Sequence, residues 1–161
     1  MKTFTDAAGR TWTITLNLGT AMKVKAKLDI DLLQPEAGDP PLLTRLGTDE
    51  LLLGEVFCAL LEGQFEAHKV TADDVRAAFD GQTLLAAQKA FYEEMIDFFR
   101  SRGRNDRAKA VAKQMAMIEA AVTAVETRID ALDIEATISS ALTPGPMSGA
   151  SPGPSASTPG L

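Results

Sequence analysis

The side chains that most often act as nucleophiles or bases are scarce in this sequence. It holds one cysteine, Cys58, and one histidine, His68. Nucleophilic catalysis needs a base within hydrogen-bond reach of the nucleophile, and no serine or cysteine stands close to His68 in the chain. Cys58 falls within an apolar helical pattern, which favours a buried structural thiol. His68 is expected at a helix end or in a surface loop.

Carboxylate pairs are the second kind of residue that could do chemistry. Asp29 and Asp31 could begin a metal site, but no further ligands follow at a fixed spacing, so a capped turn is the favoured interpretation. Glu93 and Glu94 are adjacent and point in different directions on a helix, which makes them poor partners for acid–base work. The sequence also lacks P-loop, GxGxxG, CxxC, HExxH and GxSxG motifs. We therefore expect no enzyme activity, no metal and no cofactor.

A basic link is the third candidate, with four arginines between Arg100 and Arg107. Such a cluster could hold phosphate or an acidic partner surface. More often such a run is a solvated turn whose cations lie near a helix C-terminus. The net charge of −6 makes general nucleic-acid binding unfavourable, because the attraction to phosphates would be weak or repulsive.

The most regular pattern in the chain is an uninterrupted helical stretch from Asp106 to Leu142. It contains neither Pro nor Gly, and at 1.5 Å per residue it would extend roughly 55 Å. Its apolar residues recur at alternating intervals of four and three, the a/d spacing of a helix that packs along one seam. This seam must face the preceding helices, a second copy of the chain or another protein. The candidate partner-binding residues are Val111, Met115, Ile118, Val122, Val125, Ile129 and Leu132.

The elements that must support this helix begin with a β-hairpin over residues 2–17. Alternation places Trp12, Ile14 and Leu16 on one face and threonines on the other, with turn residues from Asp6 to Gly9. A two-stranded hairpin is marginal alone, so its apolar face should lie on helices.

The remaining pattern predicts a helical bundle. Helix signals include Thr48 ahead of two acidic residues and a capping box that opens at Thr71. The expected helices cover about residues 17–28 or 20–28, then 42–46, 49–66, 72–79 and 82–99. With 45% hydrophobic residues, the chain can build a core. The predicted fold is mainly α: a small N-terminal β-hairpin, a helical bundle with a long C-terminal helix, and a tail.

The composition changes sharply after Leu142. Residues 143–161 hold five Pro, four Gly and four Ser and no charged side chain, so we predict a disordered tail beside a folded domain of residues 1–142. No apolar run reaches the 18 residues of a membrane span, and the N-terminus lacks a signal-peptide core. Together with the single cysteine, this predicts a soluble cytoplasmic protein.

The segment KTFTDAAGRTWTI, residues 2–14, together with the acidic helical body and the Pro/Gly/Ser-rich tail, resembles tail assembly chaperones of long-tailed phages and prophages. The resemblance implies a non-catalytic protein of the host cytoplasm. Such a protein binds the tape measure protein, keeps its long apolar helices soluble and helps to recruit tail tube subunits. In that family a longer form is often made by ribosomal frameshifting near the end of the gene. The resemblance supplies no binding-residue signature.

Other interpretations stay open at this point. The chain could be a structural tail or connector component, or a small helical regulator that binds nucleic acid through Arg100–Arg107. An apolar stripe of this kind is most often ordinary core, and self-association is a further alternative. An apolar seam, an acidic exterior and the lack of a catalytic motif agree best with a chaperone for a helical client.

Overall fold

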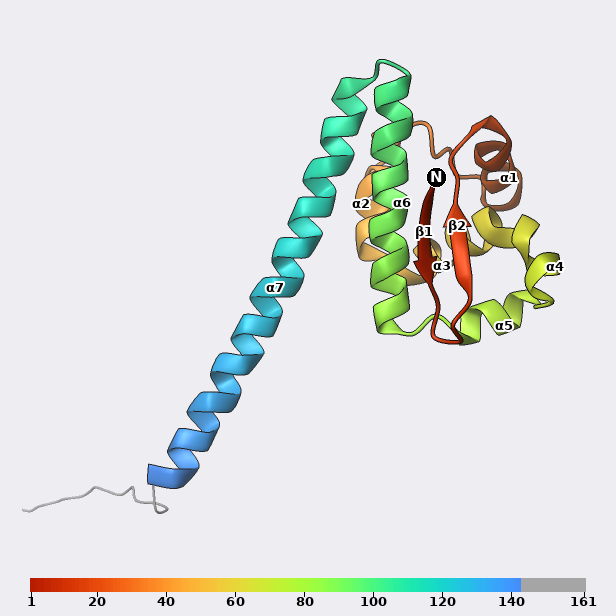
Figure 1. Cartoon of the computed structure of the whole chain (residues 1–161). Helices are drawn as coiled ribbons and strands as arrows, with labels where there is room; N and C mark the ends of the chain where they lie inside the picture. Colours follow the sequence, from red (N-terminus) through yellow and green to blue (C-terminus); the bar gives the residue numbers. More distant parts are fainter. Residues whose placement is uncertain (143–161) are drawn as a thin grey trace, which may run out of the picture. The chain divides into compact units, whose positions relative to one another are not determined.

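The computed structural model describes the backbone of residues 1–142 and the side chains of residues 1–132, so the predicted tail at 143–161 lies outside the described residues. The fold is mainly helical with an N-terminal hairpin and a long C-terminal helix, as the sequence predicts (Figure 1). Packing divides the chain into two units, Met1–Ile118 and Glu119–Leu161. The elements are β1 (Lys2–Thr5), β2 (Thr11–Ile14), α1 (Leu18–Leu28), α2 (Leu42–Thr48), α3 (Glu50–Leu61), the 3-10 helix η1 (Glu62–Gln64), α4 (Phe65–His68), α5 (Ala72–Ala77), α6 (Gly81–Ser101) and α7 (Asn105–Leu142).

The two strands form the predicted antiparallel hairpin. Phe4 lies opposite Trp12, and Gly9 takes a φ of +83° in the turn, where a side chain would be strained. Trp12, Ile14 and Leu16 are all buried, which confirms the predicted apolar face. That face lies on α6 and α3 (Figure 1), so the hairpin has the helical cover that it needs.

A buried carboxylate organises the hairpin turn. The carboxylate of Asp6 accepts hydrogen bonds from the backbone N–H of Ala8 at 3.0 Å, from that of Arg10 at 2.9 Å and from the Trp12 indole at 2.8 Å. Burial alone would raise the pKa of Asp6, but the bonds from Trp12, Arg10 and Ala8 outweigh it and lower the pKa below its usual value. The charged form of Asp6 therefore ties the turn to the only tryptophan.

Two polar side chains from the helices hold the rest of the hairpin. Glu94 of α6 is buried; it accepts a hydrogen bond from the N–H of Leu16 at 2.8 Å and pairs with the Met1 amino group at 2.7 Å. Gln64 accepts from the N–H of Thr13 at 3.0 Å and donates to its carbonyl at 2.8 Å. These bonds satisfy backbone groups that the two-stranded sheet leaves unpaired.

Helix starts follow the capping rules, with one correction. Asn17 is the N-cap in a capping box at the start of α1, and Thr71 is the N-cap in the predicted capping box at the start of α5. The expected hydroxyl cap at Thr48 is wrong. Thr48 ends α2 and donates to the carbonyl of Thr44, while Asp49 caps α3 by accepting from the third helical N–H.

The single helix predicted over residues 49–66 is also wrong. α3 ends at Leu61, and the chain turns through η1 into the short α4. Gly63 is a weak helix former at the break. The turn allows Gln64 to bond β2 and Phe65 to pack edge-on against Trp12, with ring centroids 6.0 Å apart. These contacts with the hairpin replace the helical continuation.

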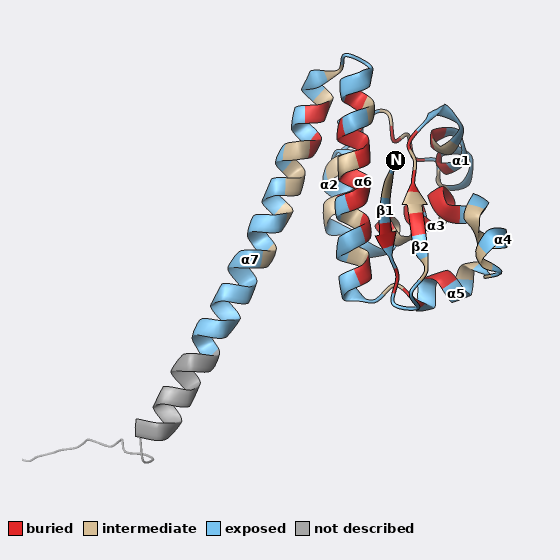
Figure 2. Ribbon diagram, viewed as in Figure 1, coloured by how far each residue is buried: buried red, intermediate tan, exposed pale blue. Residues whose placement is uncertain are grey.

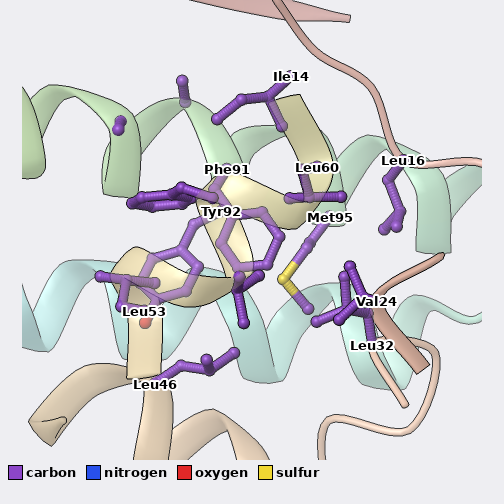
Figure 3. Packing of buried hydrophobic residues seen from close by; sticks show 14 of the residues in the cluster. Ile14, Leu16, Val24, Leu32, Leu46, Leu53, Leu60, Phe91, Tyr92 and Met95 are labelled. Carbon is purple, nitrogen blue, oxygen red and sulfur yellow. The ribbon is translucent and has the colours of Figure 1, made fainter. Parts of the chain in front are cut away.

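The core lies where α3 and α6 meet beneath the hairpin. Phe91, Tyr92 and Met95 of α6 pack with Leu53 and Leu60 of α3 (Figure 3). All five residues fall within predicted helical ranges, 49–66 and 82–99, and their two helices together form the centre of the fold. The buried stripe of α6 faces this cluster, as the burial colouring shows (Figure 2).

Candidate partner-binding surfaces

The first part of the predicted seam belongs to the core of the first unit. Val111 is fully buried, and Met115 and Ile118 pack against the same hydrophobic cluster. Gly47 of α2 leaves the space that this part of α7 occupies: a Cβ there would lie 3.7 Å from Cδ1 of Ile118 and would collide with the end of Gln114. These seam residues therefore act in folding.

The second part of the seam is open. Val122 is half-buried, whereas Val125, Ile129 and Leu132 are 52%, 51% and 57% exposed. The exposed colouring covers this part of α7 in Figure 2. Residues spaced by three and four lie on one side of a helix, so these side chains form a continuous apolar surface. We call Val122, Val125, Ile129 and Leu132 the open stripe.

The open stripe can bind by apolar burial. Fully burying a Val, Leu or Ile side chain contributes about 1.5–3 kcal/mol, and these residues are already about half covered. The gain on docking is therefore on the order of 1 kcal/mol for each residue, before the cost of association. Such a surface suits one segment of a long contact with an apolar helix better than a compact tight site.

Two of the four arginines in the basic link joining α6 to α7 form ion pairs within the chain. Arg104 donates two hydrogen bonds to Asp106, at 3.0 and 2.9 Å, and this contact lowers the pKa of Asp106 to about 2. Arg107 bonds Glu36 and a backbone carbonyl of the preceding loop. These arginines line a pocket of about 520 Å³ with Leu and Phe side chains. Two of the four positive charges are thus compensated within the chain.

The carboxylates considered for a metal site serve local structure. Asp29 caps the end of α1 with a left-handed φ of 55°, and its side chain pairs with Lys25 at 2.9 Å. Asp31 accepts from the N–H of Leu33 at 2.9 Å. Both are turn residues, as the favoured interpretation predicts. Within the described part of the chain, no three His, Cys, Asp or Glu side chains lie together as metal ligands would.

The single histidine and the single cysteine lie on different helices and in different surroundings. His68 is the last residue of α4, and its ring centroid lies 4.4 Å from that of Trp12. Cys58 is half-buried on α3; burial raises the pKa of its thiol, and nearby Arg76 offsets this only in part. A raised pKa keeps the thiol protonated at neutral pH, which is unfavourable for a nucleophile.

A groove on α3 is a second surface, and the sequence patterns did not predict it. It has a volume of about 380 Å³ and lies between α3 and the segment that runs from α5 into α6. Leu51 is 84% exposed on its wall. Gly54, in the middle of α3, leaves this side of the helix without a side chain. The groove is lined by Glu50, Leu51, Gly54, Glu55, Cys58, Arg76, Phe79 and Leu84.

Comparison of the chain with protein-family models, with curated proteins and with solved structures gives no match. Among the helices of the described residues, none is long and apolar enough to span a membrane. The open stripe and the groove on α3 therefore carry the functional inference on their own geometry and charge.

Proposed function

We propose that this chain is a non-catalytic tail assembly chaperone of a long-tailed phage or prophage. In this role it binds the tape measure protein in the host cytoplasm, keeps that protein soluble and helps to recruit tail tube subunits. The family follows from the resemblance of residues 2–14, the acidic helical body and the tail composition.

The observation that supports a client-binding role most directly is the open stripe of α7. A seam with one regular spacing runs through Val111, Met115 and Ile118 in the core and continues through residues with about half of their surface exposed. An amphipathic helix with an open apolar face can pair with an apolar helix of another protein. A tape measure protein offers long helices of that kind.

The test replaces Val122 and Ile129 with glutamate in the same chain. Each charge would have to be buried unpaired when an apolar helix docks, which costs far more than the contact it replaces. We expect the double variant to keep its circular dichroism spectrum and to lose the ability to keep a co-expressed tape measure protein soluble. The measurement is the soluble fraction of the client after co-expression.

The matched control is the double variant Thr123→Glu and Thr127→Glu. These residues are exposed on the opposite side of α7 and introduce the same two charges. This variant should protect the client as well as the unmodified chain does. If Val122→Glu with Ile129→Glu is folded and still protects the client, the open stripe is not the client site. If it unfolds, the stripe is part of the core.

A structural tail or connector subunit could use the same stripe, in a permanent contact. The two functions differ in where the protein ends up, because a chaperone leaves and a structural subunit stays. Mass spectrometry of purified particles should find the tape measure protein without this chain. Recovery of the chain at a fixed ratio to the tube protein would favour the structural role.

A further inference from the structure

The groove on α3 has the character of a helix-binding site. Its wall carries Leu51, which exposes 84% of its surface, and its lining continues over the apolar side chains of Phe79 and Leu84. Exposed leucines are common singly, but one that borders a hollow lined by further apolar groups is a docking feature. The groove belongs to the first unit and contains no residue of α7.

Gly54 gives a second, independent reason to expect a neighbour there. A Cβ added at Gly54 would meet nothing within 4 Å, so the packing of the chain itself does not require glycine. Glycine inside a helix is less favourable than alanine by about 1 kcal/mol. Its lack of a side chain allows a foreign backbone to approach α3 closely.

The charges beside the groove specify what can enter. Glu50 and Glu55 lie on either side of the line formed by Leu51, Gly54 and Cys58 on α3, given 3.6 residues per turn. The cation in the lining, Arg76, already pairs with a neighbouring aspartate at 3.2 Å. The groove therefore fits a helix with an apolar strip between basic side chains.

Helix α1 of this same chain carries that pattern on its outer side. Leu18 and Met22 are 65% and 61% exposed and are one turn apart. Lys23 and Lys25 lie on either side of them and are exposed. Lys25 pairs with Asp29 at 2.9 Å, but this pair is exposed and is worth little, so Lys25 can exchange Asp29 for an acid of the groove. The inner side of α1 packs against α3, and the outer strip lies away from that contact.

We propose that α1 of one copy docks into the α3 groove of a second copy, with Leu18 and Met22 entering the groove and the lysines meeting Glu50 and Glu55. The charge distribution favours this pairing. Residues 1–28 carry five basic side chains against one acid, and residues 29–80 carry twelve acids against three bases. Opposite potentials of this kind steer association and fix its orientation.

The contact is heterologous, because it joins two different surfaces. Each copy uses its groove for one neighbour and its α1 for another, so the assembly grows as a ring or a helical filament. None of the residues of the open stripe is among those that make this contact. Repeated stripes would bind a long helical client with higher avidity than one stripe alone.

The test uses the full chain and two blocking variants. Gly54→Arg fills the groove and repels the incoming lysines, and Met22→Glu places an acid in the docking strip. The unmodified chain should show a mass by light scattering that rises above 17.1 kDa with concentration and falls with added salt. Each variant alone should remain monomeric. A mixture of the two should form 1:1 dimers and nothing larger, because one intact groove and one intact α1 remain.

Separate controls check that the variants fold and that the contact lies at the groove. Both variants should keep the circular dichroism and Trp12 fluorescence of the unmodified chain. Ala86→Arg, exposed on α6 and outside the groove lining, adds the same charge as Gly54→Arg and should assemble normally. Cys58 lines the groove and is the only cysteine, so its reaction with a thiol reagent should slow as concentration rises in the unmodified chain but not in Met22→Glu.

A monomeric mass at every concentration would overturn the proposal, and so would a mixture that forms no dimer. If the chain stays monomeric while a synthetic lysine-rich amphipathic peptide protects Cys58, the groove serves a different partner and the second copy is excluded. Failure of this self-assembly would leave the open stripe and its client test untouched, because the two surfaces share no residue.

Discussion

Val111 and Val125 are the same residue type on the same helix, two heptads apart in one seam, and their environments differ completely. Val111 is fully buried, whereas Val125 exposes 52% of its surface. The spacing of apolar residues determines which side chains share a face of a helix. It carries no information on what covers that face. In the first unit the core covers it around Val111, and α2 lies against it at Ile118; around Val125 it is open.

The difference has an energetic meaning. The packed unit gains free energy of folding from its seam residues, and a change there acts on stability. The open stripe contributes little to folding, so a change there is available to act on binding. Paired substitutions, one in each region, separate the two effects.

The largest expected effect on the free energy of unfolding comes from replacing one of these two valines with aspartate. Val111→Asp buries an unpaired carboxylate in the core and should lower the free energy of unfolding by about 3–5 kcal/mol. Val125→Asp leaves its carboxylate in water and should change the free energy of unfolding little. Urea unfolding followed by circular dichroism measures both. Equal losses at the two positions would show that the stripe around Val125 is also packed.

A smaller effect is expected from the buried carboxylate in the packed unit. Asp6→Asn replaces an acceptor with a donor facing the Trp12 indole or the Arg10 guanidinium, and should cost about 1.5–3 kcal/mol at neutral pH, the usual range for hydrogen bonds to a charged group. Asp130→Asn, at an exposed position beside the open stripe, is the matched control and should leave the unfolding midpoint unchanged. A larger loss of stability from Asp130→Asn than from Asp6→Asn would contradict the prediction that the packed unit is the more sensitive region.

The stability difference between the unmodified chain and Asp6→Asn should also depend on pH, with a definite sign. The pKa of Asp6 is lowered in the folded protein, so its stabilisation is fully present above the unfolded value of about 3.9 and is lost as the pH falls toward the folded value. The stability difference between the unmodified chain and Asp6→Asn should be constant from pH 5 to 7 and should shrink below about pH 4. A difference that is independent of pH would mean that Asp6 acts as a neutral group.

Local patterns predicted much of the fold. The hairpin faces, the capping box at Thr71 and the helix over residues 82–99 depend on residues close in sequence, and their signals are therefore local. The break after Leu61 is different. It depends on Gln64 and Phe65 contacting a hairpin about fifty residues earlier in the chain, and the apolar pattern of residues 49–66 is the same with or without that contact.

The candidate sites were predicted less completely for the same reason. Glu94 looks like one of two adjacent surface acids, and its burial depends on the distant Leu16 and Met1. The seam residues lie on α7, but the point at which their burial ends, Ile118, depends on where α2 and the core end. The α3 groove arises because three segments meet around Gly54.

The smallest expected effect is from removing most of the second unit. A chain that ends at Ala124 keeps all of the described core residues through Ile118 and about one and a half turns beyond it. Those turns preserve the backbone hydrogen bonds around Met115 and Ile118, since the last four carbonyls of a helix are unpaired. The melting temperature should therefore shift by no more than about 2 °C.

A chain that ends at Ala110 is the contrasting truncation, because it also removes Val111, Met115 and Ile118. It exposes the core surface that these side chains cover and should melt far below the unmodified chain or fail to fold. If the chain ending at Ala124 is as unstable as the one ending at Ala110, residues after Ala124 contribute to the core, and the open stripe is then part of folding. If it is as stable as the unmodified chain and no longer protects a helical client, the same seam serves folding before Ile118 and binding after it.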